Sequence, residues 1–315
     1  MTKNLFSKIK QYPSYYQGLF WIFVDVSSLT VVYIATKLFL DSLPFPVFGI
    51  YWFGTGFLWN LLFLLFTPEA KQSLKNAMKF SWFLFFVGLL DAVATIMWFK
   101  AIEETPNPSV VSFMTNISPI YALLFGMLIH KERFTLMESL GMLITFVGVV
   151  MVSYAPSFTF RIFLFQNAGI ILFSSLLSQL STAILKFKVS SIHPVVFALN
   201  RLIFLLTFVI ALLFMNPSSY SLHLPIYNIF LISVASFFGP FLSTIAGYKA
   251  LSNLKMGTYS FLLSSRSFFV LLASYIVLHN FPRIHQVVGG LTSIVGIALL
   301  SFKESLQRSK YQTKK

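Results

Sequence analysis

Four charged side chains lie within long apolar stretches of the sequence: Asp25, Asp91, Arg201 and Arg266. A charge at the centre of a bilayer costs about 2.5–3.5 kcal/mol on insertion scales, so such residues normally face a cavity or a partner. Carboxylate and guanidinium groups at one depth could bind the amine and the carboxylate of a single polar solute. Alternatively, Asp91 or Asp25 could carry a coupling proton, because burial favours the neutral carboxyl.

These roles require the apolar stretches to be membrane helices, and the composition supports this. Of 315 residues, 57% are apolar and 10% are charged, and the mean hydropathy is +0.80. Soluble domains carry about 25% charged residues. Segments of about 20 apolar residues can span a membrane. We expect an all-α protein with ten such helices, at 16–37, 45–66, 80–101, 108–130, 136–155, 163–186, 194–215, 226–249, 256–279 and 284–303.

The distribution of Lys and Arg predicts the orientation of the chain. With the N-terminus inside, seventeen of the 23 basic residues fall in inside segments, four in outside joints and two within spans. Basic residues prefer cytoplasmic loops. Both termini are therefore expected in the cytoplasm, with the chain in an inner or plasma membrane. The net charge of +14 is explained without nucleic acid.

Distance along the helices places three of the four charges at a similar depth. At about 1.5 Å per residue, Asp25, Asp91 and Arg266 lie roughly 13, 16 and 15 Å from the cytoplasmic helix ends. Arg201 is shallower, at roughly 10 Å, and is expected to snorkel or to pair within the bundle as a structural residue.

Polar and aromatic residues share helical faces with these charges. Asp91, Thr95 and Trp98 follow the i, i+4, i+7 spacing of one face, and Tyr259 lies on the side of Arg266. We expect the substrate-binding residues to be Asp91, Arg266, Asp25, Trp98, Tyr259 and Thr95. Ordinary lipid or packing contact is the alternative for the aromatic residues, and a structural ion pair for the charges.

An internal repeat relates the two halves of the chain. Phe99-Lys100-Ala101-Ile102 matches Tyr248-Lys249-Ala250-Leu251 at an offset of 149, and Gly141 and Gly148 match Gly289 and Gly296 at 148. Because each half holds five spans, an odd number, the second half should be inverted relative to the first. Inverted repeats are a recurring transporter architecture. The charged positions do not repeat, since Asp91 aligns with Pro240 and Arg266 with Ile117.

The sequence resembles the EamA-type transporters of the drug/metabolite transporter superfamily. The resemblance is carried by Trp98–Ile102, by Asn116–Ile120, by His130-Lys131-Glu132-Arg133-Phe134-Thr135 and by the span with Gly141 and Gly148. The second half departs from this pattern at 279–284, which has no counterpart of Glu132. The resemblance implies ten helices around a central cavity open to one side at a time, and transport of small polar solutes such as amino acids or S-adenosylmethionine.

We therefore expect a secondary transporter with a first five-helix repeat at 15–155, an inverted second repeat at 163–303 and a basic cytoplasmic tail at 304–315. Pro119 and Pro240 should bend their spans, and Lys100 and Lys249 should mark equivalent helix ends. The expected partners are a small-molecule substrate and the lipid bilayer, and the chain is expected as a monomer or homodimer.

Other functions are less well supported by the sequence. There is no Cys, the five His are scattered, and no phosphate-binding loop of an ATP-driven pump occurs. No metal, cofactor or catalytic residue is therefore expected. A membrane sensor or scaffold remains the alternative, and a membrane-embedded transferase is a weaker one.

Overall fold

The computed structural model describes residues 14–40, 42–104, 115–153, 168–215, 220–278 and 283–312. Within these ranges the chain is helical and has no β-strand. Six helical stretches are long and apolar enough to cross a membrane, and three shorter apolar helices accompany them. Helix occupies part of each of the ten expected segments, whereas ten complete crossings remain a prediction.

Four of the five expected segments of the first half match described helices closely, whereas the fourth, 108–130, is matched only by α7, and its residues 108–114 lie outside the described residues. The helices of the first half are α2 (Ser14–Leu40), α3 (Phe45–Phe66), α4 (Pro68–Ala77), the short 3₁₀ turn η1 (Met78–Phe80), α5 (Ser81–Glu104), α7 (Ser118–Leu128) and α8 (Leu136–Ser153). The helices of the second half are α10 (Ala168–Lys186), α11 (Pro194–Met215), α12 (Ile226–Ser236), the π-helical turn η2 (Phe237–Ser243), α13 (Thr244–Asn253), α14 (Met256–Ser264), α15 (Arg266–Leu278) and α16 (Ile284–Gln312).

Proline and a capping box explain where several helices begin. Pro46, Pro68 and Pro119 lie in the first turn of α3, α4 and α7, where a missing amide hydrogen costs nothing. At the start of α8, the Thr135 amide donates to Glu138 Oε2 at 2.7 Å, and the Glu138 amide donates to Thr135 Oγ1 at 3.4 Å. This reciprocal pair satisfies two amides that the helix itself leaves unpaired.

Two expected non-helical regions are helical. Residues 67–79 were expected to be a connection, but α4 occupies most of this segment. Its side chains, including Lys71 and Lys75, are mostly exposed. The tail at 304–315 was expected as a solvated extension, but α16 continues to Gln312. Hydropathy alone misses both segments because they are helical without being apolar.

Two spans are interrupted near equivalent positions. The ninth expected span, 256–279, is divided at Ser265 into α14 and α15. In the first half, turn residues Asn116 and Ile117 precede α7, and Asn116 lies 149 positions before Ser265. The eighth span is not broken but widened into η2 around Pro240.

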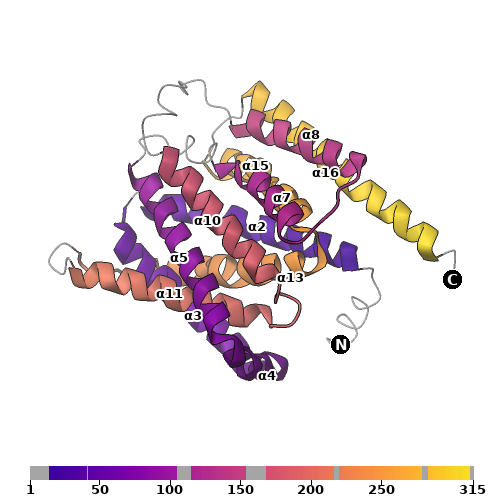
Figure 1. Ribbon diagram of the computed structural model, residues 1–315. Coiled ribbons are helices and arrows are strands. Elements are labelled where there is room, and N and C mark those ends of the chain that lie inside the picture. Colours follow the sequence, from indigo (N-terminus) through magenta and orange to yellow (C-terminus); the bar gives the residue numbers. More distant parts are fainter. Residues whose placement is uncertain are drawn as a thin grey trace, which may run out of the picture.

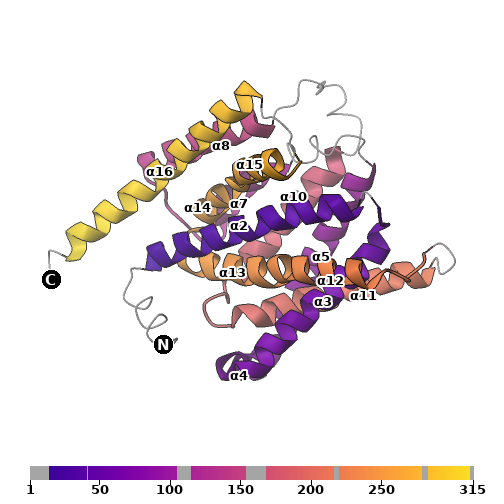
Figure 2. The same ribbon diagram turned by 180° about the vertical axis from the view of Figure 1, so that it is seen from behind.

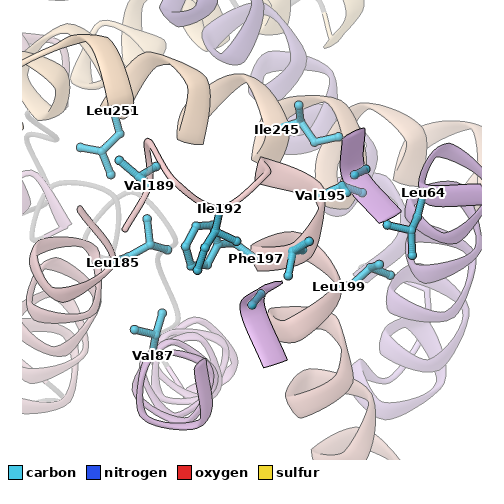
Figure 3. Packing of buried hydrophobic residues seen from close by; sticks show 13 residues of the cluster. Leu64, Val87, Leu185, Val189, Ile192, Val195, Phe197, Leu199, Ile245 and Leu251 are labelled. Atoms are coloured by element: carbon cyan, nitrogen blue, oxygen red, sulfur yellow. The ribbon is translucent and has the colours of Figure 1, made fainter. Parts of the chain in front are cut away.

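The protein interior is apolar and draws on both halves (Figure 3). One cluster gathers side chains from α3, α4, α5, α10, α11, α13 and the connection before α11, namely Leu64, Ala70, Ala77, Val87, Leu185, Val189, Ile192, Val195, Val196, Phe197, Leu199, Ile245 and Leu251. Large apolar side chains are also exposed on the outside, such as Phe66 at 83% and Trp82 at 75%. A surface of this kind is stable in lipid, where apolar exposure carries no penalty.

Helices α8 and α16 cross closely along one edge of the molecule (Figures 1 and 2). A Cβ placed on Gly148 would meet Ser293 and the carbonyl of Gly289. A Cβ placed on Gly296 would meet Thr145 and the carbonyl of Gly141. The residue numbers rise along one helix as they fall along the other, so α8 and α16 are antiparallel. Small residues allow this close approach of two membrane helices.

Candidate functional site

Asp91 of α5 and Arg201 of α11 form an ion pair inside the bundle. Arg201 Nε lies 2.7 Å from Asp91 Oδ2. Arg201 Nη2 also lies 3.4 Å from Thr95 Oγ1, and the Thr95 hydroxyl donates to the Asp91 carbonyl at 2.7 Å. The Tyr248 hydroxyl of α13 is within hydrogen-bonding reach of Arg201. Three helices thus converge on one guanidinium group.

The pair is only partly enclosed by protein. Arg201 keeps 35% of its side-chain surface accessible and Asp91 keeps 18%. Asp91 Oδ2 has no well-aligned hydrogen bond in spite of its short contact with Arg201. Arg201 was expected to be a structural residue and Asp91 a substrate-binding one. The structure joins them, so any role of one residue involves the other.

Asp25 of α2 forms a second, more deeply buried centre. Its exposed fraction is 2%, and its Oδ1 accepts a hydrogen bond from Ser243 Oγ at 2.6 Å. Its Oδ2 faces Gly247 of α13, where an added Cβ would lie 2.8 Å away. The same Cβ would lie 3.1 Å from the Tyr259 hydroxyl of α14. The Asp25 carboxyl and the Tyr259 hydroxyl therefore both lie close to the backbone of α13 at Gly247, which has no side chain.

Arg266 lies at the first position of α15, directly after the interruption at Ser265. Its guanidinium carbon is 5.7 Å from the ring centroid of Tyr33 on α2. Arg266 and Arg201 both act electrostatically on Asp25, although neither forms an ion pair with it among the described residues. The structure thus brings three predicted site residues, Asp25, Arg266 and Tyr259, into one neighbourhood.

The other residues singled out in the sequence have simpler surroundings. Trp98 is half-buried on α5, one turn beyond Thr95. Lys249 Nζ lies 4.2 Å from the ring centroid of Trp21. Lys100 is in α5, and its side chain lies outside the described residues. Pro240 lies inside η2, and its carbonyl accepts a hydrogen bond from Asn60 Nδ2 at 3.0 Å.

Two polar residues of α10 were missed by sequence reasoning. Ser175 Oγ and Gln179 Oε1 are buried and have no hydrogen-bond partner among the described residues. Ser174 donates to the Ala94 carbonyl and Ser181 to the Val87 carbonyl, so this part of α10 lies level with Asp91. Their i, i+4 spacing within an apolar span was a usable signal, because polar side chains in membrane helices face the interior.

A second polar cluster links the halves at the ends of α7 and α10. Glu132 Oε1 lies 2.5 Å from Lys186 Nζ, and both Glu132 oxygens accept from the Met256 amide, at 2.8 and 3.0 Å. Lys186 Nζ also donates to the Leu254 carbonyl at 2.8 Å. The Glu132 carboxylate thus caps α14 while it pairs with α10. We call Glu132, Lys186 and Met256 the Glu132 anchor.

No group of three His, Cys, Asp or Glu side chains within the described residues is arranged to hold a metal ion. What these residues do provide is a set of charged and hydroxyl groups inside an apolar bundle.

Comparison with known proteins decides the family. The sequence model of the EamA-like transporter family matches the chain twice, at residues 16–154 and 167–302. The chain belongs to the EamA-like transporter family. The resemblance found in the sequence is thereby confirmed, and the two matches make this EamA-like transporter a two-repeat helical membrane protein.

Similar proteins agree with this assignment. The EamA-like transporter is 25% identical over 274 residues to an uncharacterized transporter of Synechocystis sp., a match that covers 80% of this chain and 74% of that protein. A solved structure described only as the crystal structure of a protein is 14% identical, with a TM-score of 0.73, and the match covers 91% of this chain and 95% of that one. The second similarity concerns the fold alone.

Proposed function

We propose that this EamA-like transporter is a secondary transporter that moves a small polar or zwitterionic metabolite, such as an amino acid or an S-adenosylmethionine-like solute, by alternating access. The observation that carries the proposal is the Asp91–Arg201 ion pair. It lies within membrane helices, joins two helices at 2.7 Å, and leaves 35% of the Arg201 side chain accessible. A purely structural pair in an apolar bundle would be expected to be enclosed and fully hydrogen-bonded.

A zwitterionic solute could replace this pair without leaving a charge unpaired. Its amine would bind Asp91, and its carboxylate would bind Arg201 or, across the bundle, Arg266. Uncompensated charges in lipid are costly, so exchanging one set of ion pairs for another is the low-cost route for binding. Thr95 would offer a hydroxyl, and the rings of Trp98 and Tyr259 would contact the organic part of the solute.

The proposal includes ten crossings arranged as two inverted five-helix repeats around a central cavity. The antiparallel contact of α8 with α16 supports the inversion, because Gly148 meets Gly289 while Gly296 meets Gly141. A two-fold axis that lies in the membrane plane produces such reciprocal antiparallel contacts between equivalent helices. The interruptions near Asn116 and Ser265 also fit, since paired broken helices often mark a transporter's binding site.

We further propose a plasma-membrane location with both chain ends in the cytoplasm. The positive-inside distribution of Lys and Arg supports this orientation. The chain has no native Cys, so single-cysteine variants report directly on sidedness. Cysteines at positions 71 and 308 should react only from the cytoplasmic side, and a cysteine at position 220 only from outside. Labelling of positions 71 and 308 from opposite sides would contradict the orientation.

Uptake into proteoliposomes tests the transport function and its site. A panel of radiolabelled amino acids and S-adenosylmethionine is presented to wild-type protein and to the Asp91→Asn, Arg201→Gln and Arg266→Ala variants. We expect wild-type protein to accumulate at least one solute of the panel above empty liposomes. We expect each variant to lose most of that uptake while it still inserts into the membrane.

A matched control separates the site from general charge effects. Glu69 is an exposed carboxylate of α4, outside the bundle interior, so Glu69→Gln should transport like wild-type protein. Full transport by both Asp91→Asn and Arg266→Ala would remove the site assignment. Failure of the wild-type protein to move any zwitterionic member of the panel would contradict the proposed substrate class.

A further inference from the structure

The two aspartates inside the bundle have different surroundings. Asp91 has a cation at 2.7 Å and remains 18% accessible. Asp25 is 2% exposed, and among the described residues no lysine or arginine forms an ion pair with it. A buried carboxylate without a cation is strongly disfavoured in a medium of low polarity, and such a group takes up a proton instead.

The hydrogen bonding of Asp25 is that of a neutral carboxyl. Its Oδ1 accepts one hydrogen bond, from Ser243 Oγ at 2.6 Å, as a carbonyl-type oxygen does. Its Oδ2 faces Gly247 and the neighbourhood of the Tyr259 hydroxyl. A carboxylate that stays ionised inside a protein commonly accepts two or three hydrogen bonds or pairs with a cation. Oδ2 is therefore the oxygen that would carry the proton.

The π-helical turn η2 creates this arrangement. It contains Gly239 and Pro240 and ends at Ser243, and the Thr244 hydroxyl lies 3.3 Å from the Gly239 carbonyl across the widened turn. Short π-helical turns within α-helices are frequent at functional sites. Here the turn places the Ser243 hydroxyl against α2, and Gly247, one turn later, lets the backbone of α13 approach Asp25.

Several neighbouring elements contribute to the charge environment of Asp25. The groups that interact with it are the Ser243 hydroxyl from η2, Tyr259 from α14, Arg266 from α15 and Arg201 from α11, and Tyr248 from α13 acts on Tyr259. The remaining titratable residues of the packed elements have other surroundings: Lys249 of α13 lies over Trp21, the Tyr51 hydroxyl of α3 donates to the Leu222 carbonyl, and Tyr227 of α12 is exposed.

The two arginines favour ionisation of Asp25, but each is already engaged. Arg201 is paired with Asp91, and Arg266 lies against the Tyr33 ring. They stand near enough to stabilise the carboxylate once a conformational change or a bound solute alters these contacts. A carboxyl that gains and loses such partners between conformations can bind a proton in one of them and release it in the other.

We propose that Asp25 is a proton-binding site that holds its proton on Oδ2 in this conformation, whereas Asp91 serves the charge pair with Arg201. The reaction is the binding of one proton by the Asp25 carboxylate, taken from hydronium in the surrounding water and returned to water on release. A role of this proton in driving solute movement rests on the proposed transport function; the protonation itself does not.

Infrared spectroscopy of purified protein in lipid at pH 7 tests the proposal with the proton as the only ligand. Exposed Asp and Glu are ionised at this pH. We expect a carboxylic-acid C=O band that is absent from Asp25→Asn and retained in Asp91→Asn. We expect Ser243→Ala to move the band to higher frequency, because its Oδ1 loses a hydrogen bond. A wild-type spectrum without the band, or a band unchanged in Asp25→Asn, would overturn the proposal.

Thermal unfolding of the same variants gives a second, independent readout. If Asp25 is neutral, Asp25→Asn replaces one neutral group by another of the same shape, and the melting temperature should change little. Asp91→Asn leaves the Arg201 cation without its partner and should lower the melting temperature more. A loss in Asp25→Asn equal to or larger than that in Asp91→Asn would show that Asp25 is charged. Neither measurement depends on transport. A negative result in them therefore contradicts the protonation of Asp25, whereas a negative uptake assay contradicts the proposed transport function.

Discussion

The Ser243 hydroxyl donates to the Asp25 carboxyl at 2.6 Å. The residues 149 positions away, Ala94 and Ser174, are also joined, by a hydrogen bond of 2.7 Å from the Ser174 hydroxyl to the Ala94 carbonyl. The contact between α2 and the end of η2 is thus built a second time between α10 and α5. Both positions differ between the copies: Asp25 corresponds to Ser174, and Ser243 to Ala94. The helix contact is therefore repeated, whereas the carboxyl group is present in the first copy alone.

The Asp91–Arg201 pair should show strong energetic coupling. Removing one partner leaves a partly buried charge alone, and we expect Asp91→Asn and Arg201→Gln each to cost about 1–3 kcal/mol, less than for a fully buried pair. The double variant should lose less than the sum of the two. Denaturant unfolding in detergent for the four proteins of this cycle measures the coupling. Strict additivity would mean that the two side chains do not interact in the membrane protein.

The Glu132 anchor should be important for the stability of the contact between the halves. Glu132→Ala removes the partner of Lys186 and the acceptor of the Met256 amide, both half-buried or buried. We expect a loss of about 2–4 kcal/mol. Glu69→Ala, at an exposed carboxylate, should stay within about 0.5 kcal/mol of wild type. Equal melting temperatures for the two variants would contradict the assigned role.

The glycines of the α8–α16 crossing should be equally intolerant of larger side chains. Gly148→Leu and Gly296→Leu each force a side chain against the backbone of the partner helix, and we expect each to cost at least about 1–3 kcal/mol. Gly54 has no neighbouring atom within 4 Å of an added Cβ, so Gly54→Ala is the matched control and should be neutral. Folded yield after detergent extraction distinguishes these outcomes. Tolerance at position 148 with intolerance at position 296 would argue against a reciprocal contact.

His193 should make the protein less stable as the pH falls. It lies in the connection before α11, where burial lowers the pKa of its imidazole and the Lys249 charge lowers it further, against a smaller opposing effect of Glu69. The unfolded chain therefore binds the proton more readily, and stability is lost as the pH falls through the ordinary value of about 6.5. Melting temperatures between pH 8 and pH 5 should fall less steeply for His193→Gln than for wild type. The exposed His223 is the control, and His223→Gln should follow the wild-type curve. Coincident curves for His193→Gln and wild type would show that His193 does not cause the loss of stability.

The sequence predicts the helices of this protein well and its side-chain partners poorly. Long apolar runs and the prolines that begin them locate α3 and α11 to the residue, because hydropathy and proline geometry are local properties. Asp25, Asp91 and Arg266 were the charges expected at similar depth, yet the cation paired with Asp91 is the shallower Arg201. Depth along a helix does not reveal which helices are neighbours, and that order fixes the pairing.

The same limit applies to Asp25 and to α10. The hydrogen-bond donor of Asp25, Ser243, is 218 positions away, and the periodicity of a single helix cannot reveal such a partner. Ser175 and Gln179 were overlooked because uncharged polar residues barely lower the hydropathy of a span. Segment α4 was missed for a related reason: its helix lies outside the apolar pattern, and its ten residues are mainly polar.

The antiparallel crossing of α8 and α16 has a consequence for how the chain is made. Residues of α8 emerge from the ribosome about 140 positions before those of α16, so the glycine face of α8 stays without its native neighbour until synthesis is almost complete. During that interval the membrane insertion machinery, lipid, or α8 of another nascent chain must cover it. Packing of α16 against α8 is therefore a late step that follows membrane insertion. A chain truncated before α16 would leave the glycine face of α8 exposed and would tend to associate with other copies of itself.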